Sequence, residues 1–184
     1  MRHLCFILIA AVSLAFAGHA QVITNIFTTD LEAFEAQTGT VIIKGFGEVG
    51  SVSTGGGIIS VRSKESVNVS TGSRQYGIAV GFTGNDQFVE RLLVDYSELD
   101  SLINSIDYLG KITSDATVLP GFEAEYSTKS GLQIIAYSSR KQGIILTFVQ
   151  CRDRPRISLT SEQMTQLEGL IGQAKASLDS LRTK

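Results

Sequence analysis

The chain has 184 residues, of which 43% are hydrophobic and 18% charged, and its formal net charge is -2 at pH 7. This length is enough for one domain with a sizeable core. A mildly acidic chain lacks the basic field of a dedicated nucleic-acid binder, and the same charge disfavours binding to anionic membrane surfaces.

Residues 1–20 have the three parts of a secretory signal peptide: a short basic head, an apolar run over residues 4–17, and small residues before a cleavage site at Ala20. The apolar run is shorter than the roughly 20 residues that span a bilayer. We therefore expect a soluble, secreted or periplasmic protein that begins at Gln21 and has no transmembrane segment. Cleavage removes both histidines and leaves Cys151 as the single thiol.

A short helix is the first predicted element of the mature chain, within residues 21–39. Thr29 and Glu32 have the spacing of a capping box, and Gly39 follows as a stop signal. Runs rich in β-branched and aromatic residues then alternate with clusters of glycine, serine and asparagine, a pattern typical of strands and turns. Four strands are predicted, at residues 41–43, 58–62, 76–82 and 87–94.

A helix follows these strands, and the same order then recurs. Apolar residues with helical spacing predict the first amphipathic helix: Leu99, Leu102, Ile103, Ile106 and Leu109. Four further strands are predicted at residues 122–126, 132–138, 144–149 and 156–159. The final helix carries Met164, Leu167, Leu170, Ile171, Ala174 and Leu178.

The two halves of the chain align with each other when residues 91–106 are laid over residues 156–171. Apolar residues then coincide at positions 92/157, 94/159, 99/164, 102/167 and 106/171. Asp95-x-x-Glu98 and Thr160-x-x-Gln163 also coincide, so both helices are predicted to begin with a capping box. An internal duplication and a coincidence of order both remain open.

The predicted fold class is α+β. A short N-terminal helix precedes a first β4α unit over residues 40–110 and a second over residues 117–182, each an antiparallel sheet followed by an amphipathic helix. The two units form one compact domain in which the sheets pack their apolar faces together or against the helices.

This order of elements resembles the tandem β4α architecture of the PUR-repeat and Whirly single-strand nucleic-acid-binding proteins. The resemblance covers roughly residues 40–181 and is one of architecture alone. No basic-aromatic motif of the chain matches the binding strands of those families, so no binding residue is carried over. Predicted export and net acidity argue against their function.

A GxGxxG pattern is formed by Gly45, Gly47 and Gly50. A dinucleotide site needs a helix directly after the glycines, whereas residues 51–57 are rich in serine and glycine, which break helices. We therefore interpret the pattern as a strand that bends or bulges, followed by a hairpin loop.

Histidine is absent from the predicted mature chain, so a Ser-His-Asp triad is impossible. Cys151 has Arg152 and Arg154 nearby, which can lower the pKa of a thiol. A lone cysteine at the end of an apolar strand is nevertheless more typical of a small core residue. No cofactor is predicted, and no metal site, since the chain has no D-x-D-x-D-G loop.

Paired carboxylates are the remaining candidates for catalysis. Glu123 and Glu125 are two apart on a predicted strand, so their side chains share one face. Such pairs hydrolyse sugars when the two carboxyl groups lie about 5–9.5 Å apart. The alternation with apolar residues also fits an ordinary solvated face.

The most conspicuous basic cluster is formed by Arg140, Lys141, Arg152, Arg154 and Arg156. If both loops lie at the same end of the sheet, these residues make a local anion patch suited to phosphates, carboxylates and sulfated sugars. The alternative is a solvated connection in which Asp153 partly neutralises its neighbours.

The predicted function is that of an exported, non-enzymatic protein that binds a partner or assembles through a sheet surface or an edge strand. The partner is an unidentified protein, a polyanion or a second copy of the chain. One alternative is binding of polyanions or single-stranded nucleic acid through the arginine patch. The other is a carboxylate-dependent hydrolase.

Overall fold

The first helix, α1 (Asp30–Glu35), begins at a capping box. The Thr29 hydroxyl accepts a hydrogen bond from the Glu32 amide, and the Glu32 side chain accepts one from the Thr29 amide, so two otherwise unpaired amides are satisfied. The computed structural model describes residues 28–84, 89–139, 144–152 and 156–183. The predicted signal peptide therefore lies outside the described residues.

The first sheet follows α1 as an antiparallel meander with the strand order β1-β2-β3-β4. Its strands are β1 (Ile42–Thr54), β2 (Gly57–Asn68), β3 (Arg74–Gly84) and β4 (Val89–Asp95). The GxGxxG pattern lies within β1, where the register with β2 shifts between Glu48 and Gly50. This confirms the interpretation of the glycines as part of a strand with a bulge.

The second sheet repeats the meander with the order β5-β6-β7-β8. Its strands are β5 (Gly121–Ser127), β6 (Leu132–Ser139), β7 (Ile144–Cys151) and β8 (Ile157–Leu159). On β5, exposed Glu123 and Glu125 alternate with half-buried Phe122, Ala124 and Tyr126. The predicted placement of both glutamates on one face is therefore confirmed.

A helix follows each sheet. The first is α2 (Leu99–Lys111), entered through the short 3-10 turn η1 (Tyr96–Glu98), and the second is α3 (Ser161–Arg182). A second 3-10 turn, η2 (Ser114–Ala116), lies between α2 and β5. The capping box predicted for α3 is present, with Thr160 and Gln163 bonded to each other's backbone amides.

The capping box predicted at Asp95 and Glu98 is wrong, since neither side chain caps the helix that follows it. The carboxylate of Asp95 instead accepts hydrogen bonds from the amides of Asp30 and Leu31, at the start of α1. Glu98 accepts one from the amide of Lys129. Both carboxylates therefore bind backbone amides of other segments in place of the amides at the start of the helix that follows them.

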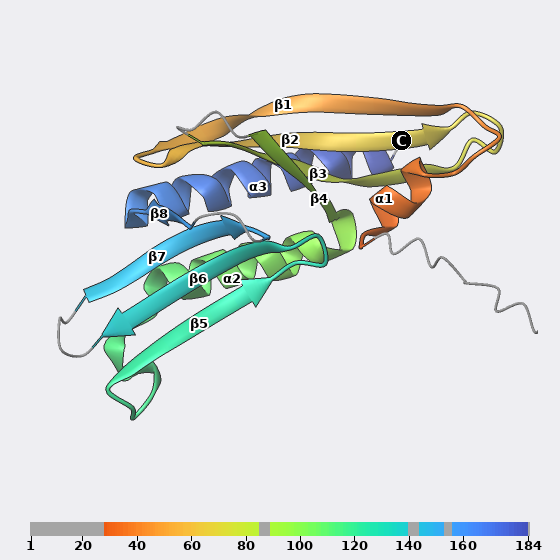
Figure 1. Ribbon diagram of the computed structural model, residues 1–184. Helices are drawn as coiled ribbons and strands as arrows, with labels where there is room; N and C mark the ends of the chain where they lie inside the picture. Colours follow the sequence, from red (N-terminus) through yellow and green to blue (C-terminus); the bar gives the residue numbers. More distant parts are fainter. Residues whose placement is uncertain (1–27, 85–88, 140–143, 153–155, 184) are drawn as a thin grey trace, which may run out of the picture.

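Each helix packs mainly on the sheet of the other half (Figure 1). Helix α3 contacts β1, β2 and β3, whereas α2 contacts β5 and β6, and the two helices contact each other. The side chains between these layers belong to one core cluster of the described residues, which includes Phe82 and Val94 of the first sheet and Ile134 and Val149 of the second. The predicted α+β class is confirmed.

Glycine is needed at position 77 on β3, where α1 covers the outer face of the first sheet. A Cβ atom there would lie 2.2 Å from the Val94 carbonyl oxygen and 2.5 Å from Cδ1 of the fully buried Leu31. Gly169 is the opposite case, because it is exposed on α3 and a Cβ atom there would meet nothing within 4 Å.

These two glycines provide a matched test of the packing of α1. We expect Gly77→Ala to lower the free energy of unfolding by about 1–3 kcal/mol, since it overpacks a closed contact. We expect Gly169→Ala to raise it by roughly 0.5–1 kcal/mol through helix propensity. Urea denaturation of both variants checks this, and equal effects of the two substitutions would contradict it.

Candidate functional site

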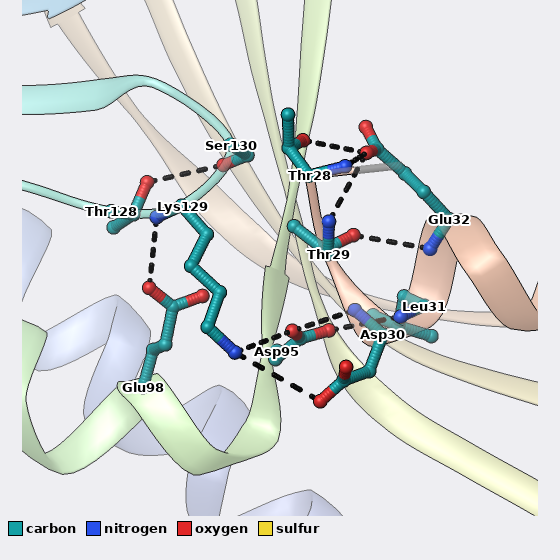
Figure 2. A network of polar contacts seen from close by, with 10 residues as sticks. All are labelled: Thr28, Thr29, Asp30, Leu31, Glu32, Asp95, Glu98, Thr128, Lys129 and Ser130. Atoms are coloured by element: carbon teal, nitrogen blue, oxygen red, sulfur yellow. Dashed lines mark hydrogen bonds and ion pairs between the residues drawn. The ribbon is translucent and has the colours of Figure 1, made fainter. Parts of the chain in front are cut away.

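A buried carboxylate fixes the position of α1 on the sheet (Figure 2). Asp95 is 1% exposed, and its two oxygens accept the amides of Asp30 at 2.9 Å and Leu31 at 3.0 Å. The Lys129 ammonium lies 3.6 Å from one of these oxygens. The carboxylate therefore faces the positive end of α1 and a cation, which compensates for its burial.

The turn between β5 and β6 reaches the same point from the second sheet (Figure 2). The Lys129 amide donates to Glu98 over 2.9 Å, while its ammonium lies 3.9 Å from Asp30. Arg152, which follows β7, adds a contact of 3.8 Å to Glu32 of α1. Helix α1 is thus held by both sheets.

Glu35, at the C-terminal end of α1, contacts strands β1 and β2 at the edge of the first sheet. One oxygen of Glu35 accepts from the Ser66 hydroxyl at 2.6 Å and lies 2.8 Å from the Lys64 ammonium. The other oxygen lies 2.7 Å from the ammonium of Lys44 on β1. The side chain of Lys64 is only 3% exposed, so its charge depends on Glu35 for compensation.

Two opposing effects act on the pKa of Glu35. Burial alone raises the pKa, whereas hydrogen bonds from Lys44, Lys64 and Ser66 and the charge of Lys64 lower it. The lowering effects are stronger together, so the pKa of Glu35 lies below its ordinary value. The carboxylate is therefore held in its charged form by its neighbours.

An exposed aromatic ring lies on β1 next to this charge cluster. Phe46 is 45% exposed, although the Lys64 ammonium is 4.2 Å and the Arg91 guanidinium 5.7 Å from its ring centroid. Both cations lie within the range of a cation–π interaction. The ring is thus held against the outer face of the sheet while nearly half of it faces solvent.

The outer edge of β1 is open, since among the described strands only β2 pairs with it. The Val69 amide donates to the Val41 carbonyl, and the Asn68 amide donates to Ser73, away from β1. Because hydrogen-bonded and non-hydrogen-bonded pairs alternate in an antiparallel ladder, the backbone groups that face the open edge belong to Ile42, Lys44, Phe46 and Glu48.

A groove follows the helix side of the same edge. It has a volume of about 250 Å³ and lies between the β1–β2 pair and the C-terminal end of α3. Gly45 and Gly47 form part of its floor, and Leu178 and the 40% exposed Leu181 come from α3. Because the two glycines have no side chains, the groove continues along this part of the strand. Phe46, the open edge and this groove are the candidate site, which we call the β1 edge.

Three residues of the predicted anion patch, Arg140, Lys141 and Arg154, lie outside the described residues, so the patch stays a prediction. The other two have carboxylate neighbours. Arg152 lies near Glu32, and the Arg156 guanidinium is 2.8 Å from a carboxylate oxygen of Glu123.

The predicted carboxylate pair engages in cross-strand contacts on the outer face of the second sheet. Glu123 binds Arg156, and Glu125 accepts hydrogen bonds from Ser127 and, at 2.7 Å, from Gln133. These contacts fit the solvated face that the alternation of the sequence also allowed. Cys151 is 1% exposed and belongs to the core cluster, as predicted from its place at the end of an apolar strand.

No group of three or more histidine, cysteine or acidic side chains that could hold a metal ion occurs in the described part of the chain. Within the same residues, no helix has both the length and the apolar character needed to cross a membrane. The chain matches no family model, no curated protein and no solved structure.

Sequence reasoning missed the Glu35–Lys64 pair and the role of Lys44. Lys44, Lys64 and Ser66 lie just beyond the strands predicted at residues 41–43 and 58–62, and β1 and β2 extend over them. Their meeting with Glu35 depends on α1 folding back over the sheet, and no local pattern gives that direction.

The depressed pKa of Glu35 makes its contribution to stability dependent on pH. We expect Glu35→Gln to lower the free energy of unfolding by about 2–3 kcal/mol at pH 7, because Lys64 loses its counter-ion. A carboxyl group whose pKa is lowered on folding stabilises fully above its unfolded value, 4.5, and loses this effect as pH falls through the folded value. The difference between wild type and variant should therefore narrow below about pH 4.5.

Urea denaturation between pH 3 and pH 7 measures this difference. The matched control is Asp107→Asn, because Asp107 pairs with Lys111 on the surface of α2, away from β1, and its side chain is 42% exposed. We expect the control to change stability by less than about 0.5 kcal/mol at pH 7. A difference for Glu35→Gln that stays constant across this pH range would show that the ion pair is not its source.

Proposed function

We propose that the protein is exported and acts as a non-enzymatic binding or assembly module whose contact surface is the β1 edge. The observation that carries this proposal is a 13-residue outer strand with exposed Ile43 and Phe46 and with backbone groups directed outward. Unpaired edges of this kind take up further strands, because main-chain hydrogen bonds provide affinity and neighbouring side chains provide specificity.

We also propose that the two β4α units arose by duplication. Both sheets have the same meander order, and a helix follows each. At every aligned apolar position, both residues are buried: Leu92 and Ile157, Val94 and Leu159, Leu99 and Met164, Leu102 and Leu167, Ile106 and Ile171. Burial at matching positions is the expected remnant of a shared ancestor with one core pattern.

The two other functions considered from the sequence have less support. For polyanion binding, the described arginines Arg152 and Arg156 already have acidic neighbours. For hydrolysis, Glu123 is engaged by an arginine and Glu125 by Ser127 and Gln133. On the β1 edge, in contrast, backbone groups point outward, and none of the described strands pairs with them.

Site-specific photo-crosslinking in the host cell tests the contact surface. A photoreactive amino acid at Ile43, which is 56% exposed on the β1 edge, should give a discrete crosslinked product. The matched position is Tyr108, which is 64% exposed on α2. If no crosslinked product forms at Ile43, or if the same product forms at Ile43 and at Tyr108, the β1 edge is not the contact surface.

Export is tested by the mass of the purified protein. Expression from the full 184-residue sequence with a C-terminal affinity tag should yield a chain that begins at Gln21, recovered outside the cytoplasm. Substitution of Ala20 by lysine should block processing, because the cleavage site requires small residues. Intact-mass spectrometry distinguishes the two forms, and a wild-type chain that keeps residues 1–20 would contradict export by this route.

A further inference from the structure

We infer that the β1 edge binds a second copy of the same chain, with the two β1 strands antiparallel and Phe46 opposite Phe46 of the second copy. The inference rests on the proposed function, which assigns contact to this edge, and adds the identity and register of the partner. It follows from three features of β1: the direction of its backbone groups, the order of its charges and the absence of side chains at Gly45 and Gly47 on its helix side.

Backbone direction limits the possible registers. Ile42, Lys44, Phe46 and Glu48 direct their amide and carbonyl groups to the open edge. A second strand must present outward-facing residues opposite them for both partners to exchange hydrogen bonds. A second β1 satisfies this when Lys44 lies opposite Glu48, Phe46 opposite Phe46, and Glu48 opposite Lys44.

Charge selects this register from the alternatives. Lys44 and Glu48 lie at equal distances on either side of Phe46 and share its face of the strand. The chosen register therefore brings opposite charges together twice, once on each side of the twofold axis. Shifted registers place Lys44 against Phe46 or against another Lys44, or Glu48 against Phe46 or another Glu48. Opposite charges on facing strands stabilise a pair of strands, and like charges destabilise it.

Strand β5, one of the two outer strands of the second sheet, shows the contrasting pattern. Glu123 and Glu125 flank Ala124 on β5, so an antiparallel pairing of two β5 strands about Ala124 places glutamate against glutamate. Charges of one sign on an edge protect it from pairing with itself. The charges of β1 have opposite signs and are placed symmetrically about Phe46. They therefore disfavour the shifted registers and favour the register that pairs Phe46 with Phe46.

The helix side of β1 is also free at the centre of the pairing. Gly45 lies opposite Gly47 of the second copy, and these glycines carry no side chains into the groove. The grooves of the two chains therefore adjoin beneath the paired strands. Each brings the exposed side chain of Leu181 to this region, so pairing gives these apolar surfaces a neighbour.

Charge-reversed variants of the full-length protein test the register. We expect the wild type to dimerise, as measured by sedimentation velocity over a range of concentrations. Lys44→Glu places two glutamates opposite each other, and Glu48→Lys places two lysines opposite each other. Each substitution alone should raise the dimer dissociation constant about tenfold or more.

Mixing the two variants is the decisive step. One chain with Lys44→Glu and one with Glu48→Lys again have opposite charges at both positions, so the mixture should dimerise like the wild type. Unfolding of either variant cannot produce this recovery, and circular dichroism of each verifies its fold. Lys111→Glu on α2 is the matched control, since it reverses an exposed charge away from β1. It should leave dimerisation unchanged.

Monomeric wild-type protein at all concentrations, or a mixture that fails to recover, would overturn the inference. The crosslinking experiment separates this result from failure of the proposed function. A monomeric protein whose Ile43 position crosslinks to a different protein overturns the second copy as partner, while the β1 edge stands as the contact surface. A monomeric protein without a product at Ile43 overturns both.

Discussion

Exchange of helices between the two sheets is the constraint on which the rest of the structure depends. Helix α2 follows the first sheet but packs on β5 and β6, and α3 follows the second sheet but packs on β1, β2 and β3. Neither sheet has its apolar face covered mainly by the helix that follows it. The first sheet is therefore completed only when the last element of the chain is in place, which makes the two halves one cooperative unit. Helix α3 thereby lies beneath β1. The outer edge of β1 pairs with none of the described strands.

A series of polar contacts carries this constraint from the centre of the molecule to the β1 edge. Asp95 and Lys129 hold the start of α1 where the two sheets meet. The other end of α1 then brings Glu35 within contact of Lys44 and Lys64. Lys64 in turn lies against the ring of Phe46. The exposed side chains of β1 are thus positioned by a helix that is itself fixed by both halves of the chain.

Local patterns of the sequence were sufficient for the order of the main helices and strands and insufficient for their lengths and contacts. The first strand, for example, was predicted at residues 41–43, whereas β1 covers Ile42–Thr54. The capping boxes at Thr29 and Thr160 were predictable because all their partners lie within three residues. The same pattern at Asp95 failed because a helix from elsewhere in the chain competes for that carboxylate. The bulge in β1 could be predicted from its glycines. The open edge could not, since it depends on which strands become neighbours and on where each helix packs.

The geometry of the charges links the proposed contact to the fold of each chain. The Lys44 ammonium has three donors, so it can keep its contact with Glu35 and also bind Glu48 of a second copy. Glu48 lies beside Arg62 of its own chain. In the inferred pairing of two β1 strands, charges of alternating sign would follow one another, from Glu35 through Lys44 of one chain to Glu48 and Arg62 of the other. Because Glu35 belongs to α1, Lys44 connects the inferred contact between chains to the helix that is docked on the outer face of the sheet.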